Sequence, residues 1–282
     1  MNMWPVSLIR EISERRVVIF IGAGISKSAL NQLPTWSNLI NSLAENLRTK
    51  TEKNLVSRMV SKGLLLDAAQ IVSDGINAPD LATKLTGIFK VKAPHSDVYK
   101  NILSLDAKVV ITTNYDQFIE KNFDHFTDSH SPYSVFKQSG TNLLDNIRSP
   151  SRALIKIHGC ISDPSDLILD RSSYFRLKQK NPATFSTLSA LFHVNTVLFL
   201  GYSVSDPDMQ LILESINQTN QAQNGHYALL AKMEHPSLQK SLKNSYNISI
   251  VEYPRNDHSK AIDMISELYQ KVISFREEHG II

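Results

Sequence analysis

Short apolar runs alternate along this chain with longer segments in which apolar residues recur at helical spacing. The apolar runs, several of which end in polar residues, lie at 17–21, 108–116, 153–159, 196–208, 226–231 and 248–254. They are apolar at consecutive positions rather than at alternate ones, which is typical of strands buried on both faces of a parallel sheet. The pattern therefore predicts an α/β fold: a Rossmann-like, mostly parallel sheet with helices on both faces.

Helical spacing marks the segments around these strands. Helices are expected at 5–15, 36–47, 183–194 and 259–278. More helix is expected up to about residue 104, interrupted near Gly75 and Pro79, whereas 117–150 is polar and loop-rich, with some helix. We expect a single domain over 1–282. Its parts are a Rossmann-like core at 13–30, 105–120 and 150–282, and a helical insertion module at about 36–104.

The composition narrows the class of protein. Lys and Arg total 30 against 27 Asp and Glu, so the net charge of +3 gives no strong signal for nucleic-acid binding. Cys160 is the one cysteine, which excludes a disulfide framework and a cysteine-rich zinc site. The amino terminus lacks the apolar core of a signal peptide, and no run reaches the ~18 apolar residues of a membrane span. A cytoplasmic protein that does not bind membranes is expected.

The glycines that follow the first strand predict a turn that comes close to a ligand. Two phosphate motifs are matched only in part. Ser26 stands where a P-loop needs its second glycine, and Lys27 where a dinucleotide fingerprint needs its third. What remains is Gly22-Ala23-Gly24, followed by a helix whose free N–H groups would favour an anion. A plain structural turn is the alternative.

Polar residues follow four of the strands at the end where each strand finishes. The tips read Gly-Ala-Gly-Ile-Ser at 22–26, Thr-Thr-Asn-Tyr-Asp at 112–116, His-Gly at 158–159 and Gly-Tyr-Ser at 201–203. In parallel α/β sheets, ligands bind off the carboxyl ends of the strands. We therefore expect these tips to converge around one ligand, although they lie far apart along the chain.

These stretches, taken in order, resemble the sirtuin family, and most closely the divergent sirtuin-like proteins of bacterial anti-phage defence systems. The resemblance rests on 22–26, 112–116, 156–159 and 201–208, and it spans roughly residues 13–275. It implies a protein that binds NAD+ across a Rossmann-like sheet and breaks the bond between nicotinamide and ribose.

By this resemblance, the catalytic residues would be Asn114, which holds the ribose beside the scissile bond, and His158, the general base. Asp116 would contact the nicotinamide amide. The residues expected to bind NAD+ are Gly22, Ala23, Gly24, Ser26, Thr113, Asp116, Gly201, Tyr202, Ser203 and Asp206. Other interpretations stay open. Asn114 could be a turn residue, His158 a buried structural histidine, and Asp116 and Asp206 helix caps.

Two departures from the sirtuin pattern bear on the activity. Sirtuin deacylases carry a Pro-Asp-Phe-Arg-type segment after the glycine turn, where this chain reads Leu-Asn-Gln-Leu-Pro-Thr-Trp at 30–36. They also carry four zinc cysteines after the His-Gly tip, where this chain has only Cys160. We expect an NAD+ glycohydrolase with NAD+ as its substrate and no zinc or other metal. The alternatives are an NAD-dependent protein deacylase or ADP-ribosyltransferase, and a non-catalytic nucleotide-binding scaffold.

The resemblance also bears on partners. It implies an effector that depletes NAD+ during phage infection, and such an activity needs to be gated. No sensor domain is expected after the closing helix, so gating is expected through a homo-oligomer and a separate partner chain. A HerA-type ATPase is the first candidate for that partner, and a short Argonaute-type protein is the second.

The remaining reactive and aromatic side chains are expected to be structural. Cys160 has only His158, on the same strand, as an activating base. Trp36 belongs to an ordinary amphipathic helix. The histidines expected to be structural or exposed are His193, His226 and His258.

Overall fold

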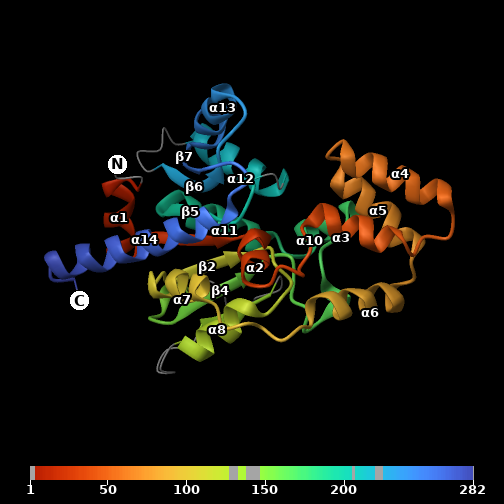
Figure 1. Cartoon of the computed structure of the whole chain (residues 1–282), viewed down its shortest axis with the longest axis horizontal. Coiled ribbons are helices and arrows are strands. Elements are labelled where there is room, and N and C mark those ends of the chain that lie inside the picture. The colour runs from red at the N-terminus through yellow and green to blue at the C-terminus, as the bar shows by residue number, and fades with distance from the viewer. Residues whose placement is uncertain (1–3, 127–132, 138–146, 205–206, 220–224, 282) are drawn as a thin grey trace.

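The computed structural model describes residues 4–126, 133–137, 147–204, 207–219 and 225–281 (Figure 1). Its strands are β1 Val17–Ile21, β2 Val109–Thr112, β3 Tyr133–Phe136, β4 Arg152–Lys156, β5 Thr196–Leu200, β6 His226–Ala231 and β7 Ile248–Tyr253. They form one seven-stranded sheet in the order β3-β4-β2-β1-β5-β6-β7, and every neighbouring pair is parallel. The predicted α/β class is confirmed. The edge strand β3 is an addition, because it lies in the segment expected to be loop-rich.

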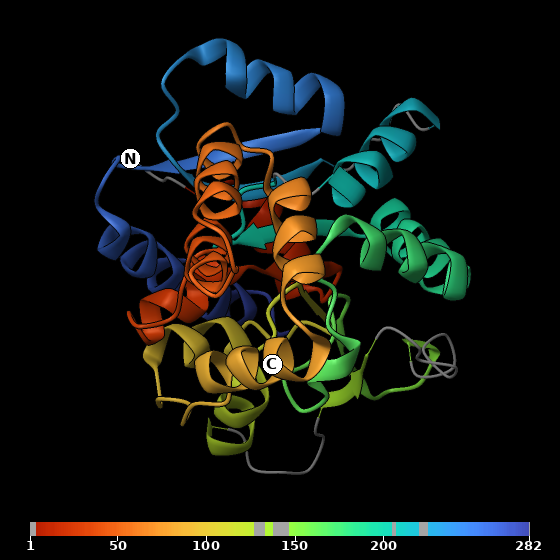
Figure 2. The same cartoon turned by 90° about the vertical axis from the view of Figure 1, so that its right-hand side faces the viewer.

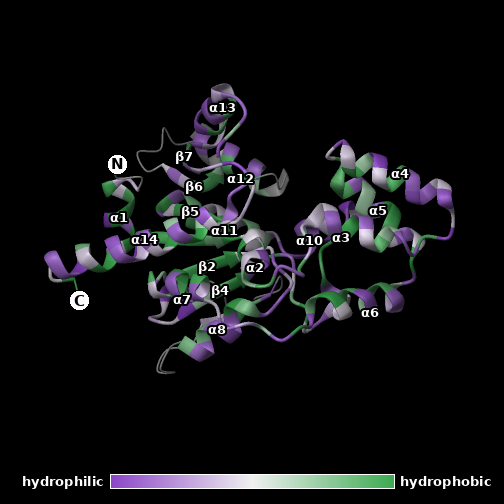
Figure 3. Ribbon diagram, in the orientation of Figure 1, coloured by the Kyte–Doolittle hydropathy of each residue, from purple (hydrophilic) through white to green (hydrophobic). Residues whose placement is uncertain are grey.

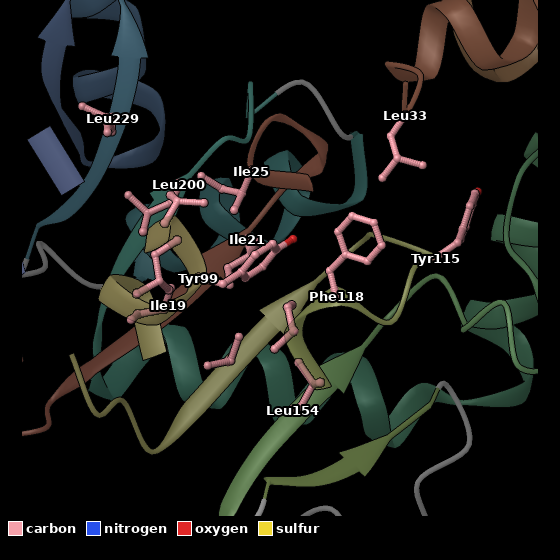
Figure 4. Close-up of a cluster of buried hydrophobic side chains, with 14 of the residues drawn as sticks. Ile19, Ile21, Ile25, Leu33, Tyr99, Tyr115, Phe118, Leu154, Leu200 and Leu229 are labelled. Carbon is pink, nitrogen blue, oxygen red and sulfur yellow. The ribbon is translucent and has the colours of Figure 1, made fainter. Parts of the chain in front are cut away.

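Strand β1 lies at the centre of the sheet and shows how the two layers of core are formed. All five of its residues are buried, and successive side chains point to opposite faces. Ile19 and Ile21 belong to the apolar core on one face, together with Tyr99, Phe118 and Leu154 (Figure 4). On the other face, Val18 and Phe20 pack with Phe199 and Phe192. A strand of this kind cannot tolerate a polar residue on either face, which explains its unbroken apolar sequence.

The helices cover both faces of the sheet. The helices whose buried residues join the core with Ile19 and Ile21 include α1 Val6–Ser13, α2 Ala23–Ala29, α7 Asp97–Ser104, α8 Phe118–Phe126 and α14 His258–Glu278. On the opposite face lie α11 Pro182–Val194 and α12 Pro207–Thr219, and α13 Pro236–Tyr246 packs beside α12. The hydropathy of the residues differs between the sheet and the outer helices. The strands are largely hydrophobic, coloured green, and α4 carries many hydrophilic residues, coloured purple (Figure 3).

A group of helices projects beyond the carboxyl ends of the central strands (Figures 1 and 2). We call it the helical module. Its members are α3 Trp36–Ala44, α4 Lys50–Ser61, α5 Leu65–Gly75 and α6 Ala78–Phe89. Short-range signals set its boundaries. Thr35 caps α3, a capping box between Thr49 and Glu52 opens α4, and α5 ends at Gly75 as expected. Asn77 then caps α6, with Pro79 in its first turn.

Two further helical segments join the helical module to the sheet. They are the short 3-10 turn η1 Pro164–Asp166 and the helix α10 Arg171–Lys180, and both follow β4. α10 packs on α5, and η1 packs on α6. The loop after β4 therefore reaches from the sheet to the helical module and back, which closes one side of the space between them.

The long helix α14 ties distant parts of the chain together. Trp4 donates from Nε1 to the carbonyl of Met264 at 2.9 Å. Arg276 is buried and donates to the carbonyls of Ile12, Ser13 and Leu105, which lie at the ends of α1 and α7. Carbonyls at helix ends lack intrahelical partners, so one guanidinium satisfies several of them at once. Within the described ranges, no helix has both the length and the apolar character needed to cross a membrane.

Candidate active site

One cavity of about 410 Å³ lies between the carboxyl ends of the central strands and the helical module. The predicted site residues that line it are Ala23, Gly24, Ser26, Thr113, Asn114, Asp116, His158, Gly201, Tyr202 and Ser203. Gly22 lies directly behind this lining, at the end of β1. Asp206 is outside the described residues. The four polar tips thus meet in space, because parallel strands present their carboxyl ends at one edge of the sheet.

Glycines let the tips of β1 and β5 touch. The N–H of Gly22 donates to the carbonyl of Leu200, and the N–H of Gly24 donates to the carbonyl of Gly201, both at 2.9 Å. A Cβ atom on Gly22 would lie 2.5 Å from the Gly201 oxygen, well inside van der Waals contact. Gly201 has a φ of +61°, where a side chain is strained, and a Cβ there would meet the Ile25 nitrogen at 2.5 Å. The tips of β1 and β5 are therefore held together by direct contact between their backbones.

The start of α2 offers fewer N–H groups to an anion than predicted. The N–H of Gly24 is bonded to Gly201, and the N–H of Ile25 donates to the carbonyl of Gly22 at 3.1 Å. The sequence could not show this, because the acceptor of the Gly24 bond lies on a distant segment of the chain. The turn comes close to the cavity as expected, but in this conformation two of its donors are already used.

Asn114 is held by a chain of buried hydrogen bonds. Its Nδ2 donates to Ser26 Oγ at 2.9 Å, and Ser26 Oγ lies 2.9 Å from the Tyr99 hydroxyl. The N–H of Asn114 donates to Thr112 Oγ1 at 3.0 Å. Burial, reinforced by the nearby Asp116 carboxylate, raises the pKa of the Tyr99 hydroxyl well above its usual range, so Tyr99 is a neutral partner. The carboxamide of Asn114 therefore has a fixed direction at the cavity wall.

Asp116 lines the cavity and also caps a helix. Its Oδ1 accepts from the N–H of Phe118 at 3.0 Å, at the start of α8, so the helix-cap interpretation describes one of its oxygens. Beneath it, the fully buried Lys156 donates to the Asp116 carbonyl and, at 3.0 Å, to Glu120 Oε1. Glu120 Oε2 is buried and has no hydrogen-bond partner in the described part of the chain.

His158 follows β4 and lines the cavity with only 9% of its surface exposed. Its Nε2 lies 2.8 Å from the hydroxyl of Tyr174 on α10, and the two rings meet edge to face with centroids 4.9 Å apart. The carbonyl of His158 accepts from the N–H of Ile168 at 3.0 Å. The imidazole is therefore a buried, hydrogen-bonded group that still borders the cavity.

Several lining residues were not predicted from the sequence. Besides Tyr174, they are mainly apolar side chains from the helical module and the loops, among them Leu33, Trp36, Leu65, Phe89, Tyr115 and Ile168. Leu33 and Tyr115 are seen near one another in Figure 4. Trp36, assigned above to packing alone, also lines the cavity. An amphipathic stripe predicts burial without saying what it faces, so these residues carried no signal of their own.

The other titratable side chains lie elsewhere. Cys160 is buried. His226 is buried in β6, where its Nδ1 accepts from the Val197 N–H at 3.1 Å. Burial, with Lys243 and His193 nearby, lowers the pKa of His226 to about 4, so it is neutral at ordinary pH. None of the residues that the structure describes form a cluster of three or more His, Cys, Asp or Glu suited to a metal ion.

Comparison with known proteins places the chain in a family. Residues 108–251 match the model of the SIR2-like domain. The chain is 28% identical over 243 residues to the NAD(+) hydrolase ThsA of Cytobacillus dafuensis, covering 85% of this chain and 44% of that protein. It is 24% identical over 228 residues to defense-associated sirtuin 2 of Bacillus subtilis, covering 76% of this chain and 21% of that one. The chain thus spans less than half the length of these relatives.

Solved structures support the same placement at the level of the fold. A mutant Sir2 homologue in complex with ADP-ribose superimposes with a TM-score of 0.52 at 14% sequence identity, covering 97% of this chain and 98% of that one. Identity this low shows a shared fold and nothing finer. The seven-stranded parallel sheet is therefore a Sir2-like Rossmann fold. Together with the domain match over 108–251, this shows that the chain belongs to the SIR2-like family.

Proposed function

We propose that this protein is an NAD+ glycohydrolase, which releases nicotinamide and leaves ADP-ribose. One observation carries the proposal. Asn114 and His158, from the tips of two neighbouring strands, border the same cavity as the glycine tips of β1 and β5. Homology to the ThsA proteins, which are named NAD(+) hydrolases, supports the same substrate.

The proposed reaction uses the chain's groups for orientation and proton transfer. The bond between ribose C1′ and the nicotinamide nitrogen breaks through an oxocarbenium-like transition state, and its electron pair leaves with nicotinamide. Because nicotinamide leaves from a cationic nitrogen, no strong acid is required. Water then bonds to C1′ and gives up a proton to His158, the positioned base at the cavity wall.

The two sides of the cavity would divide the binding of the dinucleotide. The diphosphate would lie at the tips of β1 and β5, where Ala23, Gly24 and Gly201 line the cavity. Asn114 would direct its carboxamide at the ribose. The Asp116 oxygen that does not cap α8 would accept from the nicotinamide amide. The apolar wall of the helical module would exclude bulk water from the reacting centre.

The biological role in this proposal is depletion of NAD+ in anti-phage defence. The Cytobacillus dafuensis relative is named an NAD(+) hydrolase, which supports consumption of NAD+, and the Bacillus subtilis relative is named a defense-associated sirtuin, which supports a role in defence. A freely active enzyme of this kind would damage its own cell, so we propose control through a homo-oligomer and a separate partner chain. A HerA-type ATPase is the first candidate partner, and a short Argonaute-type protein is the second.

Product analysis tests the activity. NAD+ is mixed with the purified chain, alone and with the protein encoded next to it, and the products are separated by chromatography. We expect nicotinamide and ADP-ribose in equal amounts, with a faster rate when the partner is present. Intact NAD+ under every condition would contradict the proposal and favour a scaffold. Nicotinamide release that depends on an acylated peptide would indicate a deacylase.

Substitutions then assign the chemistry. His158→Ala and Asn114→Ala should each lower the rate by at least ~10²-fold, the contribution expected of a positioned base or orienting group. His193→Ala is the control, because His193 bonds the Ser189 carbonyl on α11 and does not line the cavity. Thermal unfolding of all three proteins should agree closely. A His158 or Asn114 variant that keeps most of its activity would remove that residue from the mechanism.

A further inference from the structure

The hydroxyl of Tyr174 is hydrogen-bonded to the ring of His158 in the cavity, and no sequence motif contains Tyr174. The Tyr174 hydroxyl lies 2.8 Å from His158 Nε2, and Tyr174 is itself 94% buried, with 6% of its surface exposed. The hydroxyl lines the same cavity as His158 and Asn114. A hydrogen bond at this distance and burial restricts the rotation of the imidazole.

The position of Tyr174 is set by the start of α10, independently of any ligand. A capping box joins Asp170 and Ser173, and the N–H of Tyr174 donates to the Asp170 carbonyl at 3.1 Å. Arg171 pairs with Asp67 on α5 at 2.5 Å.

The first turn of α10 and the residues just before it make two further hydrogen bonds to neighbouring segments. The N–H of Ser172 donates to Gln70 Oε1 of α5 at 2.9 Å. The Ile168 carbonyl, just before α10, accepts from the Tyr115 hydroxyl at 2.5 Å. The first turn of α10 is thus held by both the sheet and the helical module, so it presents the tyrosine hydroxyl from a rigid base.

A histidine that takes up a proton needs its ring held in one orientation and one tautomer. A neutral imidazole carries its proton on one nitrogen and a lone pair on the other, and a partner at one nitrogen selects between the two forms. A tyrosine hydroxyl is neutral near pH 7 because its pKa is ordinarily about 10. For His158 to take a proton from water, the hydroxyl must accept from Nε2–H, which leaves the lone pair on Nδ1 and ties the ring to α10.

We propose that Tyr174 is the positioning residue for His158: its hydroxyl fixes the imidazole's orientation and the nitrogen that carries the proton. This inference rests on the proposed function insofar as His158 is the general base. It adds that the orientation of the ring at this site depends on a residue of α10, outside every strand tip. The orientation of the His158 ring then depends on how α10 packs on α5.

Nitrogen-15 spectra of the histidine rings test the contact without any activity. We expect His158, identified by its absence in His158→Ala, to give the signals of one dominant tautomer, and Tyr174→Phe to average them. Tyr253→Phe is the matched control, because it removes another tyrosine–histidine bond, from the Tyr253 hydroxyl to His258 Nδ1 at 3.1 Å. That control should change His258 and leave His158 as it was. Unchanged His158 signals in Tyr174→Phe would overturn the proposal.

Kinetics provide the second readout. Tyr174→Phe should lower kcat for NAD+ cleavage about tenfold to hundredfold, less than loss of His158 itself, and leave KM within about twofold. Tyr227→Phe is the kinetic control, because the Tyr227 hydroxyl is hydrogen-bonded to Ser7 and Tyr227 does not line the cavity. A rise in KM with unchanged kcat would overturn the positioning role, because it would mark Tyr174 as a substrate-binding residue.

A further variant covers the case in which Tyr174→Phe fails to fold. 3-Fluorotyrosine at position 174 keeps the ring and hydroxyl but makes the hydroxyl a stronger donor, so the His158 signals should move; if they stay, the proposal fails. The spectra and the kinetics also distinguish the positioning role of Tyr174 from the proposed NAD+ glycohydrolase activity. Absence of NAD+ cleavage by the wild-type protein with its partner would end the proposed function, while the spectra would still report whether Tyr174 sets the His158 ring.

Discussion

The two sides of the cavity differ in the kind of contact that holds them in place. On the side formed by β1 and β5, the strand tips pack backbone to backbone, and Gly22, Gly24 and Gly201 lie so close that a single Cβ would collide. The side formed by β2 and β4 is made of side chains, in which Asn114 and His158 are each held by a hydrogen bond from another element. The first side sets a shape, and the second sets the directions of polar groups.

The difference predicts how each side fails. Added atoms should damage the glycine side, because nothing there can move without separating two strand tips. Removed functional groups should damage the polar side, because its geometry depends on individual donors and acceptors. Ser26 belongs to both, since it lies on α2 behind the glycine turn and accepts from Asn114. The following predictions test this difference between the two sides, and the variant with the largest expected effect comes first.

Lys156→Met should have the largest effect. It would leave Glu120 with no counter-charge in a buried site and remove the donor to the Asp116 carbonyl. Breaking a buried ion pair from one side costs about 3–5 kcal/mol of unfolding free energy. The double variant Lys156→Met/Glu120→Gln should recover most of that loss, because it removes the stranded charge. Urea unfolding measures both; a single variant within 1 kcal/mol of wild type would show that the pair does not support the polar side.

Gly22→Ala should come next. Its Cβ would lie 2.5 Å from the Gly201 oxygen and 2.7 Å from Tyr202 Cα, so the tips of β1 and β5 must separate. We expect a loss of about 1–3 kcal/mol in stability, as for an overpacked core, and at least about tenfold weaker ADP-ribose binding. Gly87→Ala is the control. Gly87 lies in α6, a Cβ there meets nothing within 4 Å, and the change should stabilise by about 0.5–1 kcal/mol. Equal behaviour of the two variants would contradict the contrast.

Ser26→Ala should have a smaller effect on stability and a clear one on rate. It removes the acceptor for Asn114 Nδ2 and the partner of the Tyr99 hydroxyl. The net cost should be about 1 kcal/mol, while NAD+ cleavage falls because the carboxamide loses its direction. Tyr99→Phe breaks the same chain of bonds one step further away and keeps the Asn114–Ser26 bond, so it should retain more activity. The reverse order of rates would show that Ser26 does not orient Asn114.

The last prediction concerns His226, which does not line the cavity, and the expected effect on the unfolding free energy is absent at neutral pH. Burial lowers the pKa of His226 to about 4 from its ordinary 6.5, so below pH 6.5 the unfolded chain binds the proton first. Its contribution to stability is complete above pH 6.5 and falls between pH 6.5 and 4, by at most about 1.4 kcal/mol per pH unit. His226→Asn, which keeps an acceptor for the Val197 N–H, should flatten that part of the curve of unfolding free energy against pH.

The parallel sheet and the meeting of the strand tips could be predicted from the sequence, because both follow from local patterns. Continuous apolar runs predict buried parallel strands, and parallel strands bring their carboxyl ends together. Strand β3 was missed because it is short, lies at the sheet edge and has only Tyr133 buried. Edge strands of this kind carry little apolar pattern.

Parts of the site could not be predicted, for a different reason. Tyr174 lies on the buried stripe of α10 with Leu177, where a tyrosine is indistinguishable from a core residue. The engagement of the Gly24 N–H by Gly201 depends on contact between distant segments. Asp116 shows that two interpretations can hold together, since it caps α8 and borders the cavity.

The contact between the first and fifth strands has a consequence for the newly made chain. Gly22 is synthesised long before its neighbours in the cavity wall, Gly201 and Tyr202, which lie far downstream in the sequence. Contacts between such distant segments form late, because a long loop must first be closed. A nascent chain therefore has no complete cavity until β5 has left the ribosome and inserted beside β1.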